Sequence, residues 1–334
     1  MDSAGPVMGS SWGSRLTARQ AALRDNTRTP VNTWKIRLLA AALAPLLLTG
    51  CRTTGARIAA GAFAGSGDVM ARDDDPELVR GAIPFALKTM EGLHAEIPDD
   101  DGLVLSLTSS YTQYTWAFVL QDADLAEMAG RSVEAREGHE RARKLFLRAR
   151  DYGLQGLEMR YKGITARLLS ARGLEPALAL LEASDAPLLY WTAAAWALAI
   201  ANGKSDMKLV SELPAPVAMM RRGMALAPTF DHGAFQEFFV TYEGGRSAAD
   251  GGGPAVAKAY LDRALQLSGG RKLGTLVSYA ESVLVQQQNR AEFERVLQQV
   301  LAADVDAAPE FRLANVLAQR RARALLAHAD DLFA

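Results

Sequence analysis

The sequence predicts an all-α protein in which irregular helical hairpins stack as a compact α-solenoid. Ala and Leu are abundant and β-branched residues are sparse, which favours helix over strand. Apolar residues recur at spacings of three and four in several segments, which is the period of a helix face. One short pattern of small and large apolar residues occurs more than once. A single hairpin cannot bury its apolar face, so the repeated units are expected to stack.

The first part of the chain, residues 1–50, is predicted to be a secretory signal peptide. An uncharged apolar run over residues 38–48 follows Lys35 and Arg37, and small residues lead from it to Cys51. The run is too short to cross a bilayer, which takes about 20 apolar residues. Because a signal peptide typically has about 15–30 residues, we expect the true start of translation near residue 31.

Cys51 is the only cysteine of the chain, and the sequence Leu-Thr-Gly-Cys that ends with it resembles the bacterial lipobox. The resemblance implies that Cys51 is lipidated and anchors the mature protein to a membrane in the periplasm. Arg52 follows it in place of the Asp that enterobacteria use for inner-membrane retention, which favours the outer membrane. Residues 51–75 are rich in Gly, Ala and Ser, and a flexible tether is predicted there.

The charge balance argues against a nucleic-acid partner. The chain has 37 Lys/Arg and 38 Asp/Glu, and residues 1–50 carry six and two of them, so 31 basic and 36 acidic residues remain in the mature chain. Phosphate binding needs clustered Lys/Arg, and no large basic patch is visible in the sequence. A single cysteine allows no intramolecular disulfide, and a chain of this length can bury a sizeable core without one.

The helical domain is predicted to span residues 76–334. Asp75 and Pro76 supply an N-cap and a first-turn proline for a helix that extends to about Ile97. Pro84 lies inside this helix and is expected to kink or split it. The acidic run at residues 99–101 is interpreted as the cap of the next helix, because no matching set of metal ligands follows it.

The next segment, residues 103–120, is predicted to be a helix, although its Val, Thr and Tyr content would also suit a strand. Leu107, Tyr111, Tyr114 and Phe118 fall at i, i+4, i+7 and i+11, which is one face of a helix. Such a face is more often core than a ligand cage. Buried tyrosine hydroxyls need polar partners, so a partly wet cavity is the alternative.

A hairpin motif then repeats along the chain. The same spacing of four and three, with alanine at both ends, occurs at Ala142, Phe146 and Ala149, and again at Ala257, Leu261 and Ala264. Both copies, and a degraded one over residues 222–228, resemble the second helix of a tetratricopeptide repeat (TPR). Ala149, Gly223 and Ala264 lie 74 and 41 residues apart, whereas an ideal array has a period of about 34. The sequence therefore predicts irregular TPR-like hairpins with insertions.

Residues 186–203 contain no charge over 18 positions, which approaches the length of a membrane span. Pro187, several alanines and two central tryptophans, Trp191 and Trp196, favour a fully buried helix instead. The two tryptophans either fill the core or line a cavity together with Tyr190.

An aromatic segment follows at residues 230–242. Its rings Phe235, Phe238, Phe239 and Tyr242 fall on one helical stripe. Asp231 and His232 are adjacent, and adjacent residues do not face each other on a helix. We therefore interpret Asp231 as an N-cap rather than as half of a catalytic pair.

Further helices are predicted over residues 255–267, 273–288, 291–303 and 311–333. The last carries Arg320, Arg321 and Arg323, which are expected on a solvated face or against an acidic partner. No nucleophile elbow, His-Glu-x-x-His or other metal motif occurs in the sequence. The sequence thus predicts neither an enzyme nor a metal site, and no cofactor.

Taken together, the lipobox, the degenerate TPR hairpins and three aromatic runs at residues 111–119, 190–196 and 235–242 resemble the T-component family of tripartite ATP-independent periplasmic (TRAP) transporters. The resemblance covers nearly the whole mature chain. It implies an all-α periplasmic lipoprotein that binds the solute-binding protein of a TRAP system. It also implies a homotrimer with an internal channel or cleft that takes a small hydrophobic or organic-acid ligand.

A ligand cavity of this kind would be lined by aromatic residues, since pockets are mostly apolar with a few placed polar groups. The candidates are Tyr111, Tyr114, Trp191, Trp196, Phe235 and Tyr242. Each of them, taken singly, also suits a core position. The alternative function is a TPR-like scaffold lipoprotein in envelope or outer-membrane assembly.

Overall fold

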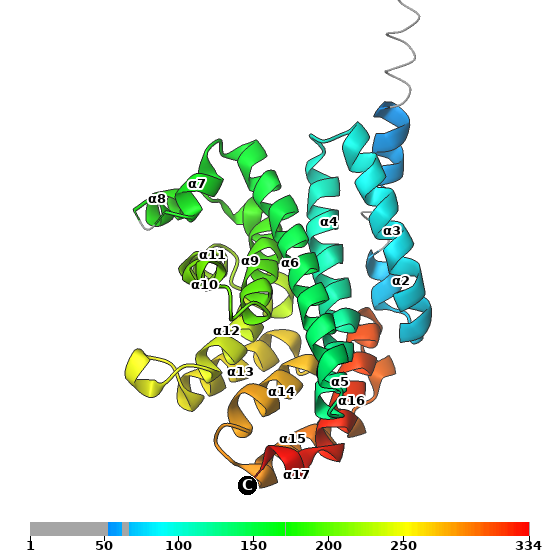
Figure 1. Cartoon of the computed structure of the whole chain (residues 1–334), viewed down its shortest axis with the longest axis vertical. Coiled ribbons are helices and arrows are strands. Elements are labelled where there is room, and N and C mark those ends of the chain that lie inside the picture. The colour runs from blue at the N-terminus through cyan, green and yellow to red at the C-terminus, as the bar shows by residue number, and fades with distance from the viewer. Residues whose placement is uncertain (1–52, 62–66, 171, 334) are drawn as a thin grey trace, which may run out of the picture. The chain divides into compact units, whose positions relative to one another are not determined.

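The computed structural model describes residues 53–61, 67–170 and 172–333, and within these ranges the chain forms helices and no strand (Figure 1). The all-α prediction is therefore confirmed. The signal peptide, the start near residue 31 and the lipidation of Cys51 lie outside the described residues and stay predictions.

The first half of the domain is built on long helices that lie side by side, with shorter helices before and between them. In chain order these are α2 (Gly67–Ala71), α3 (Pro76–Glu96), α4 (Asp101–Tyr114), α5 (Gln121–Met128) and α6 (Ser132–Arg160). Two predicted caps are confirmed. The Asp75 carboxylate accepts from the backbone N–H groups of Glu77 and Leu78 at 3.0 Å each, and that of Asp100 accepts from Leu103 at 2.9 Å.

Pro84 does not split the first long helix, contrary to that expectation. It lies inside the continuous helix α3 and is exposed. Val79 and Leu87, on either side of it in the sequence, are buried in the core formed with α4 and α6. Tertiary burial of this helix therefore outweighs the one backbone hydrogen bond that a proline removes.

The predicted flexible tether over residues 51–75 also differs from the structure. Residues 53–61 are helical, and Ala56 and Ala60 on this segment are buried against the core of α3 and α4. Arg57 pairs with Asp99 at 3.3 Å. The segment forms a helix because its small alanines allow close approach to the domain, an effect that composition alone does not reveal.

Residues 103–120 are helical as predicted, and Leu107, Tyr111, Tyr114 and Phe118 are all buried on one side. The helix widens into a π-helical segment at Thr115–Leu120. At the start of this segment the Thr115 hydroxyl donates to the Tyr111 carbonyl at 2.7 Å. It thereby competes with the backbone N–H groups that would close a regular turn.

The middle of the chain continues in helices that are shorter than α6. They are α7 (Ile164–Leu168), α8 (Leu174–Ala179), α9 (Ala186–Ala201), α10 (Met207–Ser211) and α11 (Pro214–Leu226). Helix α9 contacts α4, α6 and α11 and is buried over most of its length, as predicted. None of the helices in the described part of the chain is both long and apolar enough to cross a membrane.

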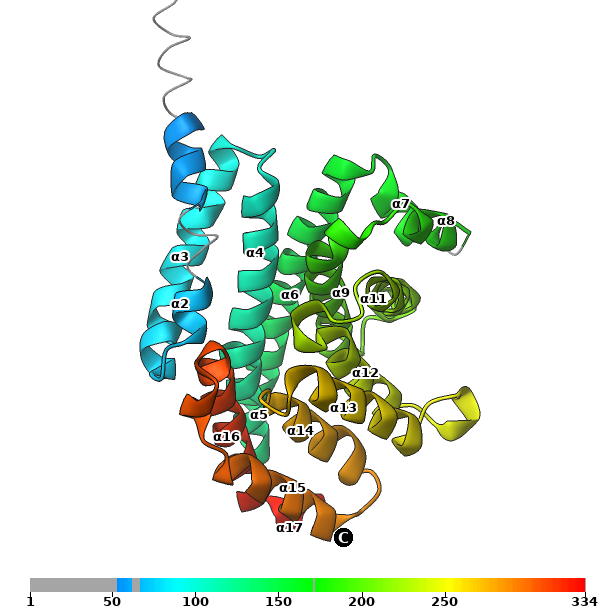
Figure 2. The ribbon, with the colours of Figure 1, turned by 180° about the vertical axis from the view of Figure 1, so that it is seen from behind.

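The C-terminal helices stack in sequence, each against the next (Figure 2). They are α12 (Ala234–Gly244), α13 (Pro254–Ser268), α14 (Gly274–Tyr279), α15 (Arg290–Ala302), α16 (Arg312–Ala327) and α17 (Ala329–Leu332). The repeated alanines of both TPR-like motifs, in α6 and α13, are fully buried where these helices meet their neighbours. Their small size lets the helix backbones approach, which confirms the hairpin prediction.

Arg321 does not lie on a solvated face of the last helix, contrary to the expectation. Its side chain is mostly buried and pairs with Glu281 at 2.5 Å and Asp124 at 3.3 Å. Helix α16 contacts α14, α15 and α3, so one side of the arginine-rich stretch necessarily points inward.

Candidate functional site

The six aromatic candidates do not line one cavity. Tyr111 and Tyr114 belong to the core between α3, α4 and α6, whereas Trp196 and Phe235 belong to a second core around α9, α11 and α12. Tyr242 borders the second core, and Trp191 is half-buried on α9. The prediction of these residues as ligand-binding therefore rests on the sequence, while the structure gives most of them packing roles.

Tyr111 has the polar partner that a buried phenol requires. Its hydroxyl donates to Glu91 of α3 at 2.7 Å, and the hydroxyl of Tyr152 donates to the same carboxylate oxygen at 3.2 Å. The two phenol rings stack at 6.1 Å. Burial raises the pKa of Glu91, but hydrogen bonds from Lys88 and the two tyrosines lower it. The lowering is larger, so the net pKa lies below the ordinary value. This group joins three helices as an ionised, satisfied carboxylate.

Trp196 is fully buried and equally satisfied. Its indole N–H donates to Glu212 at 3.0 Å, and the Arg150 guanidinium lies 5.5 Å from the centre of its ring. Arg150 also pairs with Glu212 at 3.3 Å. The three side chains form a closed group that fixes α9 against α6 and the end of α10, which is a core function.

A less complete arrangement lies where the second core meets the third, which is formed by α12 to α16. Tyr190 of α9 contacts Phe235 of α12 with ring centres 5.4 Å apart, and Phe230 at 5.5 Å. Phe235 approaches α11 at Gly223, where an added Cβ would lie 2.3 Å from its Cζ. We call this cluster the seam site and define it by six residues: Tyr190, Phe230, Asp231, Phe235, Glu237 and Lys272.

Three charged groups complete the seam site. Lys272 lies 3.2 Å from a carboxylate oxygen of Glu237 and 3.3 Å from one of Asp231, and it donates to the Asp231 carbonyl at 3.1 Å. Thr275 donates to the other oxygen of Glu237 at 2.9 Å. Burial raises the pKa of Glu237 and outweighs the neighbouring ammonium. Burial and these two carboxylates also raise the pKa of the Tyr190 hydroxyl.

The backbone at the edge of the seam site is strained. Asp231 has φ 40° and His232 has φ 54°, and Gly233 follows at φ 99°. Left-handed conformations are costly for non-glycine residues and concentrate at functional sites. The prediction of Asp231 as an N-cap is wrong, because Gly233 occupies that position of α12. Lys272 binds both the side chain and the carbonyl of Asp231 instead, which holds the turn in place.

An open hollow of about 600 Å³ lies on another part of the surface, along the C-terminal half of α6. Leu154 and Met159 supply its apolar side chains, and the other lining residues are polar or charged: Asp151, Gln155, Glu158, Lys162 and Thr165. None of the six aromatic candidates lines it. The predicted aromatic pattern could not find this hollow, because it forms where α6 ends and α7 turns away.

One group of metal-ligating side chains comes together in the described residues: Asp124, Glu127 and His139, whose ligand atoms lie within 4.8 Å of one another. Burial, with a smaller contribution from Glu281, raises the pKa of Asp124 to about 6, although Arg321 opposes this. No sequence pattern singled out these three residues. An Asp-x-x-Glu pair with a histidine twelve residues on was the available signal, and it is not a known motif.

With this geometry in view, comparison with known proteins identifies the relatives of the chain. Its sequence matches the TRAP transporter T-component family over residues 72–333. The chain belongs to this family. A protein of Treponema pallidum (strain Nichols), described as uncharacterized, is 31% identical over 268 residues, which is 79% of this chain and 82% of that protein.

Membership in the T-component family confirms the predicted resemblance, and it covers every helix from α3 to α17. The family is a transporter component and not an enzyme family. His232, which follows the seam-site residue Asp231 in the sequence, packs edge-on against Phe311 with ring centres 5.2 Å apart.

Proposed function

We propose that this chain is a lipid-anchored periplasmic adaptor of a TRAP-type transport system, and that it docks the system's solute-binding protein. The family match over residues 72–333 carries the proposal. Stacked helical hairpins support it, because such arrays offer extended surfaces for partner proteins. The proposal assigns the docking contact to the seam site.

Two features of the seam site support that assignment. The Asp231 side chain is 43% exposed, yet its backbone is held in a costly conformation by Lys272. No packing contact of this exposed acidic residue explains its strained backbone. Holding an exposed side chain in one direction is useful for recognition of a partner. The half-buried Trp191, edge-on to Tyr190 at 5.0 Å, adds an aromatic group of the kind enriched at interfaces.

The test is a binding titration between the Cys51→Ser protein, freed from its lipid, and the solute-binding protein of a TRAP system from the same organism. We expect Asp231→Ala to weaken binding by about tenfold or more, as loss of an interface anchor does. Asp330→Ala is the matched control, because Asp330 is 89% exposed on the last helix and pairs only with Arg290 in the described contacts.

Each outcome of that titration is informative. Full-strength binding by Asp231→Ala would move the docking contact away from the seam site. No binding by the parent protein would contradict the adaptor function, and co-purification with outer-membrane assembly factors would then favour the scaffold alternative.

The anchoring part of the proposal rests on Cys51 and the residues before it. We propose a lipid on Cys51 and retention at the periplasmic side of a membrane, the outer one in preference to the inner because Arg52 follows. Cys51→Ser should move the protein from the membrane fraction to the soluble periplasmic fraction. Continued sedimentation of that variant with membranes would exclude a lipid anchor.

We propose that a ligand binds in the hollow along α6 and not among the six aromatic candidates. A small hydrophobic or organic-acid ligand needs open apolar surface, and Trp196 and Phe235 have none left to offer. Mass spectrometry of molecules extracted from the purified protein tests this. Loss of the extracted molecule in Met159→Asp, with retention in Trp191→Phe, is the expected pattern.

The proposed homotrimer finds support on the outer face of α3. Leu78 and Phe85 lie seven residues apart on this helix and are 63% and 77% exposed. Gly81 between them leaves open space around its backbone. Light scattering on a sizing column should show a trimer that Phe85→Ser reduces to a monomer. Met207→Ser, at an equally exposed apolar residue elsewhere, should leave the trimer intact.

A further inference from the structure

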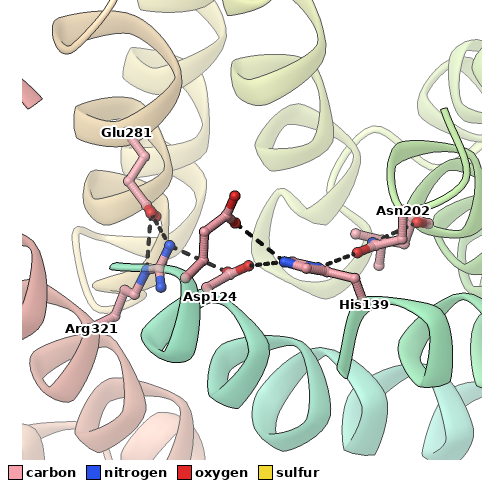
Figure 3. Close-up of polar contacts among 7 residues, drawn as sticks. Asp124, His139, Asn202, Glu281 and Arg321 are labelled. Atoms are coloured by element: carbon pink, nitrogen blue, oxygen red, sulfur yellow. Dashed lines mark hydrogen bonds and ion pairs between the residues drawn. The ribbon is translucent and has the colours of Figure 1, made fainter. Parts of the chain in front are cut away.

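We propose that Asp124 and Glu127 of α5, together with His139 of α6, form a binding site for a divalent transition-metal cation of the Zn²⁺ type. Figure 3 shows the arrangement: the imidazole lies between the carboxylates on one side and Asn202 on the other. Three properties of the cluster suit a metal: the orientation of the imidazole, the spacing of the ligand atoms and the charge balance around them.

The orientation of the imidazole is fixed by Asn202. The Asn202 amide nitrogen donates to the Leu198 carbonyl at 2.9 Å, so its amide oxygen must be the atom that faces His139. That oxygen lies 3.0 Å from Nδ1 of His139, and an oxygen acceptor there requires a proton on Nδ1. In the neutral ring, Nε2 then carries a lone pair and no proton. Metal-binding histidines are held in this way, with the second nitrogen donating to an outer partner.

The lone pair of Nε2 faces two carboxylates instead of a donor. It lies 3.3 Å from an oxygen of Glu127 and 3.8 Å from an oxygen of Asp124. A lone pair that faces two acceptors is repelled by them unless a proton or a metal cation lies between them. In a tetrahedral zinc site with ligand bonds of about 2.0–2.1 Å, ligand atoms lie about 3.3 Å apart. The distance from Nε2 to Glu127 already has this value, whereas the 3.8 Å distance from Nε2 to Asp124 would shorten when the metal binds.

The surrounding charges leave room for a dication. The second oxygen of Asp124 lies 3.3 Å from the Arg321 guanidinium, which also pairs with Glu281. Around the cluster, three carboxylates therefore face one guanidinium, and two negative charges stay uncompensated. Arg321 additionally fixes the direction of the Asp124 carboxylate, so the oxygen that faces His139 is held in position (Figure 3).

The donor set indicates the class of metal. One imidazole nitrogen and two carboxylate oxygens suit Zn²⁺ and neighbouring transition metals better than Ca²⁺, which prefers six to eight oxygens. Three protein ligands leave a fourth position for water at the exposed side of Glu127. A metal held here would fasten α5 to α6. It would lie next to the contacts that Arg321 of α16 makes with Asp124 and that Asn202, at the end of α9, makes with His139.

The test is calorimetric titration of Zn²⁺ into the chelator-treated Cys51→Ser protein, which carries no thiol to compete for the metal. We expect one ion per chain with micromolar affinity and a rise in Tm. Glu127→Gln should weaken binding at least tenfold and cannot unfold the domain, because this side chain is exposed. Asn202→Ala should weaken it about 10- to 100-fold, as loss of an outer partner does.

His94→Ala is the matched control, because His94 contacts Gln155 at 3.2 Å on another part of the domain, and it should bind as the parent does. Equal binding by Glu127→Gln and the parent would show adventitious surface binding and overturn the proposal. No binding by the parent would also overturn it, and the cluster would then be an ion pair in which a second proton on the imidazole takes the place of the metal.

Discussion

Asp185 and Glu237 are both carboxylates removed from water, and the protein treats them in opposite ways. Asp185 is 1% exposed and accepts from Tyr161 and Arg160 at 2.7 Å each and from the Glu182 N–H at 2.9 Å. Burial raises the pKa of Asp185, but the combined effect of these donors is larger and lowers it below the ordinary value. Glu237 has fewer donors, and burial leaves its pKa raised.

The difference separates a structural carboxylate from a candidate functional one. The donors to Asp185 come from the end of α6 and from the turn before α9, so the ionised group joins two elements. Glu237 receives Thr275 and a lysine that is shared with the strained Asp231. A carboxylate whose burial outweighs the effect of its partners is costly, and such groups concentrate at functional sites. This is the physical reason for placing the proposed docking contact at the seam site and not beside Asp185.

The largest effect is expected from the aromatic part of the seam site. Phe235 is fully buried between α9, α11 and α12, so Phe235→Ala should lower the free energy of unfolding by about 3–5 kcal/mol. Urea denaturation measures this. Phe235→Leu, which keeps most of the apolar volume, should cost far less. A cost below about 1 kcal/mol for the alanine variant would show that the seam site is not held by its aromatic core.

A smaller loss is expected at the satisfied carboxylate. Asp185→Ala leaves the Tyr161 hydroxyl and a backbone N–H without their acceptor and leaves Arg160 with Asp101 alone, and should cost about 2–4 kcal/mol. Asp99→Ala is the control, because the exposed pair with Arg57 contributes about 1 kcal/mol at most. Equal costs at both positions would remove the distinction between the two kinds of carboxylate.

The pH dependence of stability should differ in sign between the two sites. The stabilisation from Asp185, whose folded pKa is depressed, is present above the unfolded value of about 3.9 and is lost as the pH falls through the folded pKa. Glu237, whose folded pKa is raised, penalises the folded state at neutral pH, and this penalty disappears as the pH falls through that pKa. Unfolding curves of Asp185→Asn and Glu237→Gln against the parent between pH 7 and pH 3 resolve the two slopes. Parallel slopes would refute the comparison.

The smallest effect is expected from Glu237→Gln at neutral pH. The amide keeps an acceptor for Thr275 and removes a buried charge, while Lys272 stays paired with Asp231. The free energy of unfolding should change by less than about 1 kcal/mol. The difference from the parent should shrink as the pH falls, because the parent then protonates Glu237. A loss above about 2 kcal/mol would mean that the pair with Lys272 is a net source of stability.

Much of this fold follows from local patterns. The caps at Asp75 and Asp100, the buried face from Leu107 to Phe118 and the small residues of the repeated motif were predicted from their spacing, because a helix fixes which residues share a face. The site was less predictable. Aromatic residues in sequence runs were expected to meet in one cavity, yet the helices that carry Tyr111 and Phe235 belong to different cores.

The sequence by itself determined the helical class, the helix boundaries near most caps and the family to which the chain belongs. Only the tertiary structure decided that Pro84 stays within one helix, that Arg321 points inward and that Asp231 is held by Lys272. It also decided that His139 meets Asp124 and Glu127. The reason is the range of the forces involved. Helix propensity and capping act within a few residues, whereas burial and charge pairing depend on which helices meet.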